Sequence, residues 1–340
     1  MTDVDLHQRH PLAALAALAL LIAVATAGCS DDDPGGADPQ GADEAVDGGG
    51  EVAGRSPSPS PGCGLEPDVP LMTDEIDGDA TATFTSGGVE RSYRLAVPAD
   101  YDPDTPVPLV LNLHGATWNA LMATTYGGVA RAATDRGMIV VAPDAVNTVW
   151  DLVPVGADGD FLDALLDDVA SRYCVDEDRV HAIGMSLGAW RAATSACAYP
   201  GRIASLALVT IEIFPGDCEP LPVVAFHGTH DDRAPYGEGG GIDPARTALP
   251  DLPGALENMA GWATNGGCDT EAVVEPIGDD VTRHRYPGCD DGIDVELYTI
   301  IGGGHTWPSP AVDLVPDVPT THTIDATQLA LDWFEAHPRR

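Results

Sequence analysis

The stretch VHAIGMSLGAW, residues 180–190, decides the fold. An apolar run leads into the pattern Gly-x-Ser-x-Gly centred on Ser186, and a segment of helical character follows. Glycines on both sides of the serine allow a strand to turn sharply into a helix and to present the serine hydroxyl at the turn. A serine at a helix start can also be an ordinary N-cap that accepts a backbone N–H. The five residues alone leave both interpretations open.

Alternating strand-like and helix-like segments surround this stretch. Residues 89–101 alternate polar and apolar side chains, as in a half-exposed outer strand. Mostly apolar runs of strand length occupy residues 109–115, 138–145, 179–186, 205–211, 223–229 and 295–300. Helical spacing of apolar residues occupies residues 119–136, 160–173, 187–200, 254–264 and 325–336. This alternation predicts an α/β fold, a mostly parallel sheet with helices on both faces.

Three polar side chains follow three of the predicted strands. Ser186 leaves the end of one strand, Asp231 and Asp232 follow a later strand, and His305 follows the last one. Loops at the carboxyl ends of parallel strands gather at one edge of a sheet, where ligands bind. The order Ser, Asp, His along the chain is that of an α/β-hydrolase. We therefore expect a catalytic triad of Ser186, His305 and Asp231, with Asp232 as the alternative carboxylate.

Each residue type has a role in ester or amide hydrolysis. A serine hydroxyl becomes a nucleophile when an imidazole accepts its proton, and a carboxylate fixes the tautomer of that imidazole. The oxyanion that develops on the attacked carbonyl needs backbone N–H donors. The amide of Leu187 is one expected donor, and the other lies at Ala116 or Thr117 in the segment LHGAT.

Other polar and aromatic residues have less specific interpretations. We expect His114 and His230 to be structural, and Asp160 and Asp163 to lie on a solvated helix face. Four aromatic residues near the catalytic edge either form a platform for an aromatic acyl group or a sugar, or pack loops against the core. These are Trp118, Trp150, Tyr236 and Trp307.

The charge balance is strongly acidic. The chain has 54 acidic and 16 basic residues, a formal net charge of −38, and it contains no lysine. Such a field repels nucleic acid and anionic membrane surfaces, so we expect neither as a partner. Adaptation to high salt and the acidic linker of an exported protein both remain possible explanations of this composition.

The amino-terminal part has the pattern of an export signal. Residues 12–28 are a run of small and apolar residues too short to span a bilayer comfortably, so we expect residues 1–28 to be a signal peptide. The end of this run, TAGC, resembles a bacterial lipoprotein processing site with Cys29 as the lipidated residue; plain cleavage and release is the alternative. Residues 29–62 are rich in Gly, Pro, Ser and acid and predict a linker. The catalytic domain is expected at residues 63–340.

Several motifs together resemble a known family. The pieces LVLNLHG, VHAIGMSLG, FHGTHDDRAPY, WATNGGC and LYTIIGGGHTWP are similar to those of secreted esterases grouped with polyhydroxybutyrate depolymerases, feruloyl esterases and acetylxylan esterases. The resemblance covers about residues 63–337 and implies the triad Ser186, Asp231 and His305. Around the predicted pocket, the segments HGATWNA and NTVWDL differ from the usual family loops.

Six cysteines remain when Cys29 is set aside, and an even number in an exported chain favours disulfides. Relatives with a GCG start also tend to carry the cysteine of YCVD, and this resemblance implies the pair Cys63–Cys174. The resemblance and the expected topology together then favour Cys197–Cys218 and Cys268–Cys289.

We therefore expect a secreted serine carboxylic-ester hydrolase, a monomer that contacts a membrane only through an anchor at Cys29. Its substrates would be feruloyl or acetyl esters of polysaccharide, or polyhydroxyalkanoate. The acids of residues 74–80 do not match a calcium loop, so no metal or other cofactor is expected. A non-catalytic polysaccharide-binding lipoprotein and a peptidase on the same fold are the alternatives.

Overall fold

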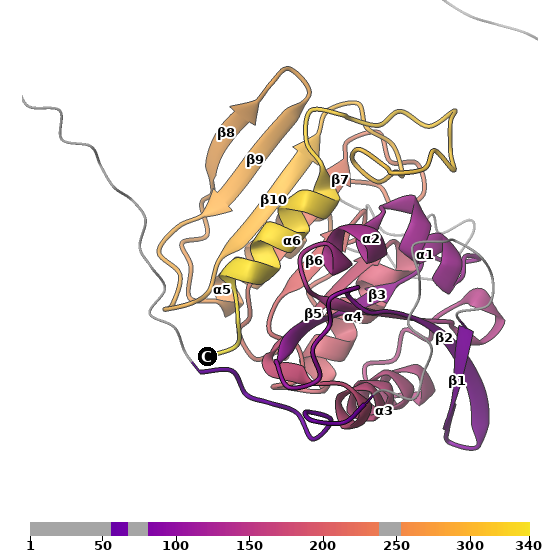
Figure 1. Ribbon diagram of the computed structural model, residues 1–340. Helices are drawn as coiled ribbons and strands as arrows, with labels where there is room; N and C mark the ends of the chain where they lie inside the picture. Colours follow the sequence, from indigo (N-terminus) through magenta and orange to yellow (C-terminus); the bar gives the residue numbers. More distant parts are fainter. Residues whose placement is uncertain (1–55, 67–80, 238–252) are drawn as a thin grey trace, which may run out of the picture. The chain divides into compact units, whose positions relative to one another are not determined.

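The structure is a computed structural model that describes residues 56–66, 81–237 and 253–340 (Figure 1). These residues belong to one compact unit, Arg55–Arg340. The predicted signal peptide, Cys29 and the acidic residues 74–80 lie outside the described residues. Within the described ranges, no helix has both the length and the apolar character that a membrane span requires.

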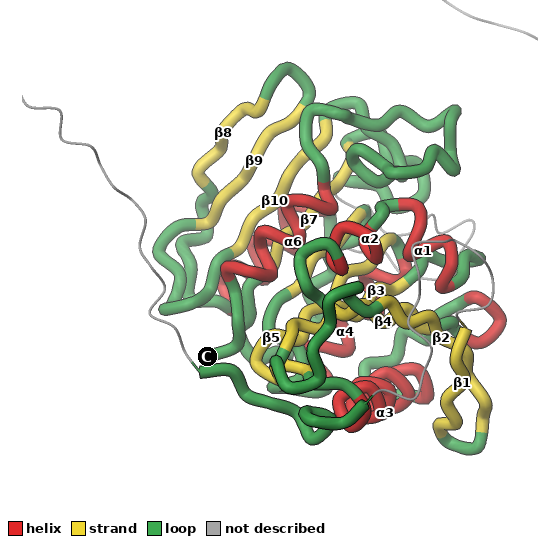
Figure 2. Tube along the Cα trace, in the orientation of Figure 1, coloured by secondary structure: helices red, strands yellow, loops and turns green. Residues whose placement is uncertain are grey.

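A ten-stranded mixed sheet forms the centre of this unit (Figures 1 and 2). Its strands are β1 (Thr81–Ser86), β2 (Val89–Ala96), β3 (Val107–Leu113), β4 (Ile139–Pro143), β5 (Val175–Met185), β6 (Leu206–Val209), β7 (Val223–Gly228), β8 (Val273–Ile277), β9 (Val281–Tyr286) and β10 (Val295–Ile300). The spatial order is β1-β2-β4-β3-β5-β6-β7-β10-β9-β8. The six strands from β4 to β10 in this order are parallel, and antiparallel strands extend the sheet at both ends. The predicted mostly parallel sheet is confirmed.

Helices cover both faces of the sheet, also as predicted. They are α1 (Ala120–Tyr126), α2 (Val129–Thr134), α3 (Ala157–Arg172), α4 (Leu187–Ala198), α5 (Ala255–Asn265) and α6 (Ala326–Ala336), with a short 3₁₀ turn η1 (Val146–Thr148). One apolar core packs α3, α4 and α5 against one face of the sheet, and a second packs α1, α2 and α6 against the other. Successive residues of a strand point to opposite faces, so Leu109 and Leu111 of β3 enter the first core and Val110 enters the second.

The predicted helix over residues 119–136 is wrong in one respect, because the structure divides it into α1 and α2. The break lies at Gly127 and Gly128, and Gly128 has a φ of +68°. The ring of Trp307 packs on Gly127 so closely that a Cβ there would lie 2.5 Å from the ring. A distant aromatic residue therefore occupies the space that a continuous helix would need.

The sequence analysis did not identify strands β1, β8 and β9, all of which lie outside the parallel part of the sheet. Strands β8 and β9 form a hairpin whose turn contains Gly278 at a φ of +63°. The run VVEPIGDDVTRHRY carries this signal, since two β-rich segments flank a short Gly-Asp-Asp turn.

The predicted boundary between linker and domain at residue 62 needs correction. The hydroxyl of Ser58 donates to Asp178, and the backbone N–H of Ser60 donates to Val175 O at 2.9 Å, beside the start of β5. The hydroxyl of Ser60 donates to Tyr173 O at 2.7 Å. The packed domain therefore begins at or before Ser58.

The structure contains the three expected disulfides, Cys63–Cys174, Cys197–Cys218 and Cys268–Cys289. The first joins the amino-terminal segment to the junction between α3 and β5. The second joins the last turn of α4 to the loop before β7, and the third joins the loops after α5 and after β9. Each closed loop stabilises a fold of this kind by about 2–4 kcal/mol.

Candidate active site

Ser186 occupies the sharp turn between β5 and α4. Its backbone lies at φ +57° and ψ −125°, which a side-chain-bearing residue rarely adopts. Its side chain makes no capping hydrogen bond to the helix that follows. The interpretation of Ser186 as an ordinary N-cap is therefore wrong, and its hydroxyl is not used to hold α4.

The two glycines of the motif allow this turn for a steric reason. A Cβ on Gly184 would lie 2.4 Å from the carbonyl group of Gly188, and a Cβ on Gly188 would lie 2.1 Å from the carbonyl oxygen of Leu113 at the end of β3. Atoms cannot approach that closely without movement of the backbone. Glycine at both positions lets β5, α4 and the loop after β3 meet around Ser186.

His305 and Asp231 lie at the same edge of the sheet, after β10 and β7. These two strands are parallel neighbours, and their loops remain joined beyond the strand ends: the N–H of Thr229 donates to Ile300 O, and that of His230 donates to Gly303 O. His305 Nδ1 donates to Asp231 Oδ2 at 2.7 Å. With Nδ1 protonated in this way, Nε2 is the nitrogen that can accept a proton.

Of the two adjacent acids, Asp231 is the one that meets His305. Asp231 is buried, and its Oδ1 accepts the N–H groups of Arg233 and Ala234 at 2.9 Å each. Burial alone would raise the pKa of Asp231, but hydrogen bonds from His227, His305 and the backbone outweigh it and hold this pKa well below its usual range. Asp232 is exposed.

The hydrogen bonds of the backbone N–H groups in this loop reduce the number of candidate oxyanion donors. The N–H of Thr117 donates to Thr148 O at 2.8 Å, so the expectation that Thr117 is a donor is wrong. Ala116 is the remaining candidate in this loop. Leu187 is the first residue of α4, where backbone N–H groups have no partner within the helix. A Cβ on Gly115 would lie 3.4 Å from Ser186 Cβ, which places the oxyanion loop directly beside the serine.

His114 and Trp150 fix the position of the proposed oxyanion loop after β3. His114 is buried, its Nε2 accepts the N–H of Ala145 at 3.0 Å, and its Nδ1 lies 2.7 Å from Gly115 O. Trp150 Nε1 donates to His114 O at 2.8 Å, and the two rings are in contact. His114 is therefore a structural residue, as expected, with its pKa lowered by burial.

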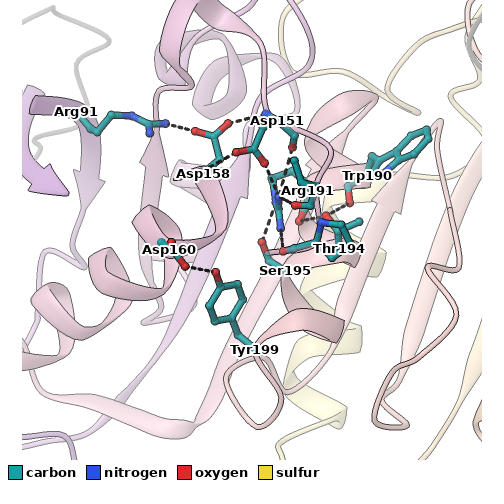
Figure 3. Close-up of polar contacts among 11 residues, drawn as sticks. Arg91, Asp151, Asp158, Asp160, Trp190, Arg191, Thr194, Ser195 and Tyr199 are labelled. Carbon is teal, nitrogen blue, oxygen red and sulfur yellow. Dashed lines mark hydrogen bonds and ion pairs between the residues drawn. The ribbon is translucent and has the colours of Figure 1, made fainter. Parts of the chain in front are cut away.

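A buried arginine fixes the segment that follows Trp150. Arg191 is on α4 with a side chain that is fully buried, and Figure 3 shows it reaching toward Asp151. Its guanidinium donates to Asp151 Oδ1, Val153 O and Pro154 O at 3.0, 2.8 and 3.1 Å, and to Ser195 Oγ. The helix that begins at Ser186 thus also anchors the loop between η1 and α3.

The same loop is tied to α3 by a second set of bonds. Asp158 accepts the N–H of Asp151 at 2.6 Å and pairs with the buried Arg91 at 2.7 Å (Figure 3). The two helix residues expected to be solvated have surface partners: Asp160 accepts from Tyr199, and Asp163 pairs with Arg202. Asp158, at the start of the same helix, is a buried acid that helical periodicity did not reveal.

The predicted aromatic platform is not formed by all four residues. Trp150 is only 1% exposed and serves the core, and Tyr236 is half-buried with its hydroxyl bonded to Thr299. Trp118 and Trp307 line a small cavity beside Gly115 and Met185. Trp307 itself is 3% exposed. A platform of all four side chains is therefore wrong, because Trp150 and Trp307 pack in the core, while Trp118 and Tyr236 are partly exposed.

Two functional candidates escaped the sequence analysis. Glu212, in the loop after β6, and His227, in β7, are both buried, and His227 Nδ1 lies 2.8 Å from Glu212 Oε2. His227 Nε2 lies 3.5 Å from Asp231 Oδ2. The available signal was a charged or titratable residue inside each of two apolar runs, VTIEIF and VVAFHG.

Among the described residues, no three His, Cys, Asp or Glu side chains form a group that could hold a metal ion.

The chain is similar to known esterases in sequence and in fold. No family model matches the chain. It is 28% identical over 231 residues to feruloyl esterase B of Piromyces equi, a match that covers 63% of the chain and 42% of that protein. It is 27% identical to feruloyl esterase C of Emericella nidulans, covering 76% of the chain and 88% of that protein.

One solved structure supports the fold. It is the acetyl xylan esterase from Aspergillus awamori, with a TM-score of 0.50 and 16% sequence identity, over 72% of this chain and 94% of that one. At this identity the similarity concerns the fold. In sequence the chain is a homologue of feruloyl esterases, and its fold is that of the α/β-hydrolases.

Proposed function

We propose that the chain is a serine esterase that works through an acyl-enzyme. His305 Nε2 accepts the hydroxyl proton of Ser186 as Oγ attacks the ester carbonyl, and the amides of Leu187 and Ala116 stabilise the oxyanion. The C–O bond to the leaving alcohol breaks, and His305 returns the proton to that alcohol. Water then repeats the cycle on the acyl-enzyme and releases the acid, while Asp231 orients and stabilises the imidazolium.

The observation that carries this proposal is the 2.7 Å hydrogen bond from His305 to Asp231 at the edge of the sheet where the strained turn of Ser186 lies. A binding protein has no evident need for either feature. Strain at one residue costs about 1–3 kcal/mol and is retained mainly at functional sites. The burial of Trp150 and Trp307 further disfavours the alternative of a polysaccharide-binding lipoprotein with an aromatic rim.

The direct test is the hydrolysis of 4-nitrophenyl acetate by Ser186→Ala. We expect its kcat to fall by at least about 10⁴-fold, because the nucleophile is lost while substrate binding remains. Ser171→Ala, an exposed serine on α3, is the matched control and should retain full activity. Wild-type turnover in Ser186→Ala would refute the assignment.

We propose feruloyl or acetyl esters of polysaccharide as substrates, and the names of the homologues support this choice. Polyhydroxyalkanoate is the second candidate, on the resemblance of the sequence motifs. Kinetics on methyl ferulate, acetylated xylan and a 3-hydroxybutyrate oligomer separate these classes. Inactivity on all three would reject both.

We propose that the protein is exported and held at the cell surface through a lipid on Cys29, with the residues before Ser58 as linker. Three disulfides support an oxidising compartment. Cys29→Ser should release the domain into the medium. If wild type and variant distribute identically, the anchor is rejected.

A further inference from the structure

Beneath the proposed triad lies a second, fully buried pair of charged groups. Glu212, His227 and Asp231 are each at most 5% exposed. Glu212 is held in place by Trp262 of α5, whose Nε1 donates to Glu212 O at 3.0 Å. His227 lies on β7 opposite Thr299 of β10. Removing ionised groups from water to this extent requires partners of opposite charge.

The hydrogen-bond partners of His227 determine its protonation. Nε2 lies 2.7 Å from Ala234 O, a carbonyl that can only accept, so Nε2 carries a proton. Nδ1 lies 2.8 Å from a carboxylate oxygen of Glu212, which accepts when ionised. With Glu212 ionised, both ring nitrogens donate and His227 is an imidazolium. An imidazole facing Asp231 at 3.5 Å is favoured in the same form.

The other groups around His227 are consistent with this charge. The ring of Tyr236 packs edge-on against it, with its hydroxyl bonded to Thr299. Burial raises the pKa of Tyr236, so this neighbour stays a neutral phenol. His305 lies beyond Asp231 and contacts His227 only through that carboxylate. Among the described residues, the titratable groups facing His227 are thus two carboxylates, one phenol and, one step away, the imidazole of His305.

We propose that Glu212 and His227 form a buried carboxylate–imidazolium pair that positions Asp231, keeps it ionised and thereby sets the acidic limit of activity. The kinetic part of this proposal rests on the proposed esterase function. His227 is a positioning residue, since it acts on His305 through Asp231. Burial opposes protonation of His227, but the attraction of Glu212 and the bond to Asp231 outweigh it and raise its pKa to about 10.

The charges of His227 and Asp231 determine the direction in which loss of His227 shifts the pH profile of activity. In the wild type the cation of His227 partly offsets the negative charge of Asp231. Its removal leaves Asp231 uncompensated, which stabilises the imidazolium of His305 and raises the pKa of that group. The esterase needs neutral His305, so the acidic limb of the kcat/KM profile should move to higher pH. Loss of one nearby charge commonly produces a shift of about one unit.

The first experiment is nitrogen NMR of the histidine rings in the intact ¹⁵N-labelled protein between pH 5 and 9. We expect His227 to show two protonated ring nitrogens throughout this range, with its signals assigned by their loss in His227→Gln. Neutral-imidazole shifts for His227 at pH 7–8 would overturn the proposal. This measurement needs no activity, so it stands even if the proposed function fails.

The second experiment follows His305 in the variant His227→Gln, by its NMR titration and by the pH profile with 4-nitrophenyl acetate. The midpoint of the His305 titration and the acidic limb of the activity profile should both move to higher pH by about one unit. His230→Gln, an exposed histidine in the same segment, is the matched control and should move neither. Should His227→Gln not fold, the double variant Glu212→Gln/His227→Gln removes both charges of the pair; the His305 titration should still move upward, by less than one unit, because His227 is the member that contacts Asp231.

Failure of the positioning role and failure of the proposed esterase function give different results. An unmoved His305 titration in a folded variant overturns the positioning role. A wild type that hydrolyses no ester rejects the proposed function, while the two NMR readings still decide the ion pair and its influence on His305.

Discussion

The backbone of Ser186 is strained, and its neighbours sustain the strain. Its N–H donates to Val209 O on β6 at 2.9 Å, and its own carbonyl accepts the N–H of Trp190 at 3.1 Å. These bonds fix the residue from both sides, so the conformation with φ at +57° is held by the surrounding elements. The hydroxyl remains outside these bonds and is available for chemistry.

The carboxylate of the triad can be tested at the same scale. Asp231→Asn keeps the shape of the side chain but no longer fixes the required tautomer of His305, so we expect kcat on an aryl ester to fall by about 10⁴-fold. Asp232→Asn, the exposed neighbour, should change kcat less than twofold. Steady-state kinetics of the two variants decide between the acids, and a larger loss in Asp232→Asn would reverse the assignment.

Single residues also show where sequence reasoning succeeds. The motif around Ser186 and the positions of Asp231 and His305 after strands were readable because strand ends share one edge of a parallel sheet. The sequence could not show that the N–H of Thr117 is already bonded, because its acceptor, Thr148 O, lies in another loop. Glu212 was hidden for a similar reason, since its partner His227 lies on another strand.

At the scale of elements, the junction of β5 and α4 is closely packed against the end of β3. The carbonyl oxygens of Leu113 and His114 come from the loop after β3 and face Gly188 in the first turn of α4. The proposed oxyanion loop and the nucleophile turn are therefore in direct backbone contact. Movement of α4 away from β3 would separate the two proposed donors.

Gly188→Ala tests this packing. Its Cβ would lie 2.1 Å from Leu113 O and 2.6 Å from His114 O, so we expect a loss of about 1–3 kcal/mol in unfolding free energy together with loss of esterase activity. Gly237→Ala, where a Cβ meets no atom of the described residues within 4 Å, is the control. Urea unfolding and kinetics measure both effects. A fully active, equally stable Gly188→Ala would contradict the proposed contact.

The elements that sequence predicted are those with a strong local pattern. The buried parallel strands and helices α3 to α6 were found because long apolar runs and helical spacing are local properties. The break between α1 and α2 was missed because it lies at Gly128, with φ at +68°, next to a glycine on which Trp307 packs from 180 residues away in the chain. The edge strands were missed because their side chains are mostly exposed and lack a clear apolar face.

At the scale of the whole molecule, buried charges link the parts that surround the site. Arg191 joins α4 to the loop before α3, and Arg91 joins β2 to α3 (Figure 3). The side chains of these two arginines are almost completely buried, unlike the arginines of surface ion pairs. Loss of one partner from such a pair leaves polar groups without compensation, which is costly.

Arg191→Met measures this contribution. We expect a loss of about 3 kcal/mol in unfolding free energy, since Asp151 and two loop carbonyls lose their donor. Arg136→Met removes an arginine that pairs with the exposed Asp332, and should cost less than about 1 kcal/mol. Chemical denaturation of both variants provides the comparison. Equal effects would show that burial of Arg191 adds nothing.

The fold class of the whole molecule was predictable, whereas the strand order and the shape of the pocket were not. Strand and helix alternation predicted a mostly parallel sheet covered on both faces, and the resemblance of motifs indicated the α/β-hydrolase fold. The pocket depends on side-chain packing between loops. For Trp150 and Trp307 the sequence left a rim position and packing against the core equally open, and the structure places both in the core.

The central claim is that Ser186 is a nucleophile activated by His305. Its most direct test is covalent labelling of the wild-type protein with a fluorophosphonate, followed by peptide mapping with mass spectrometry. We predict one adduct, on the peptide that contains Ser186, and none in His305→Ala at the same exposure. An adduct on another residue, or no adduct in a folded wild-type protein, would contradict the claim.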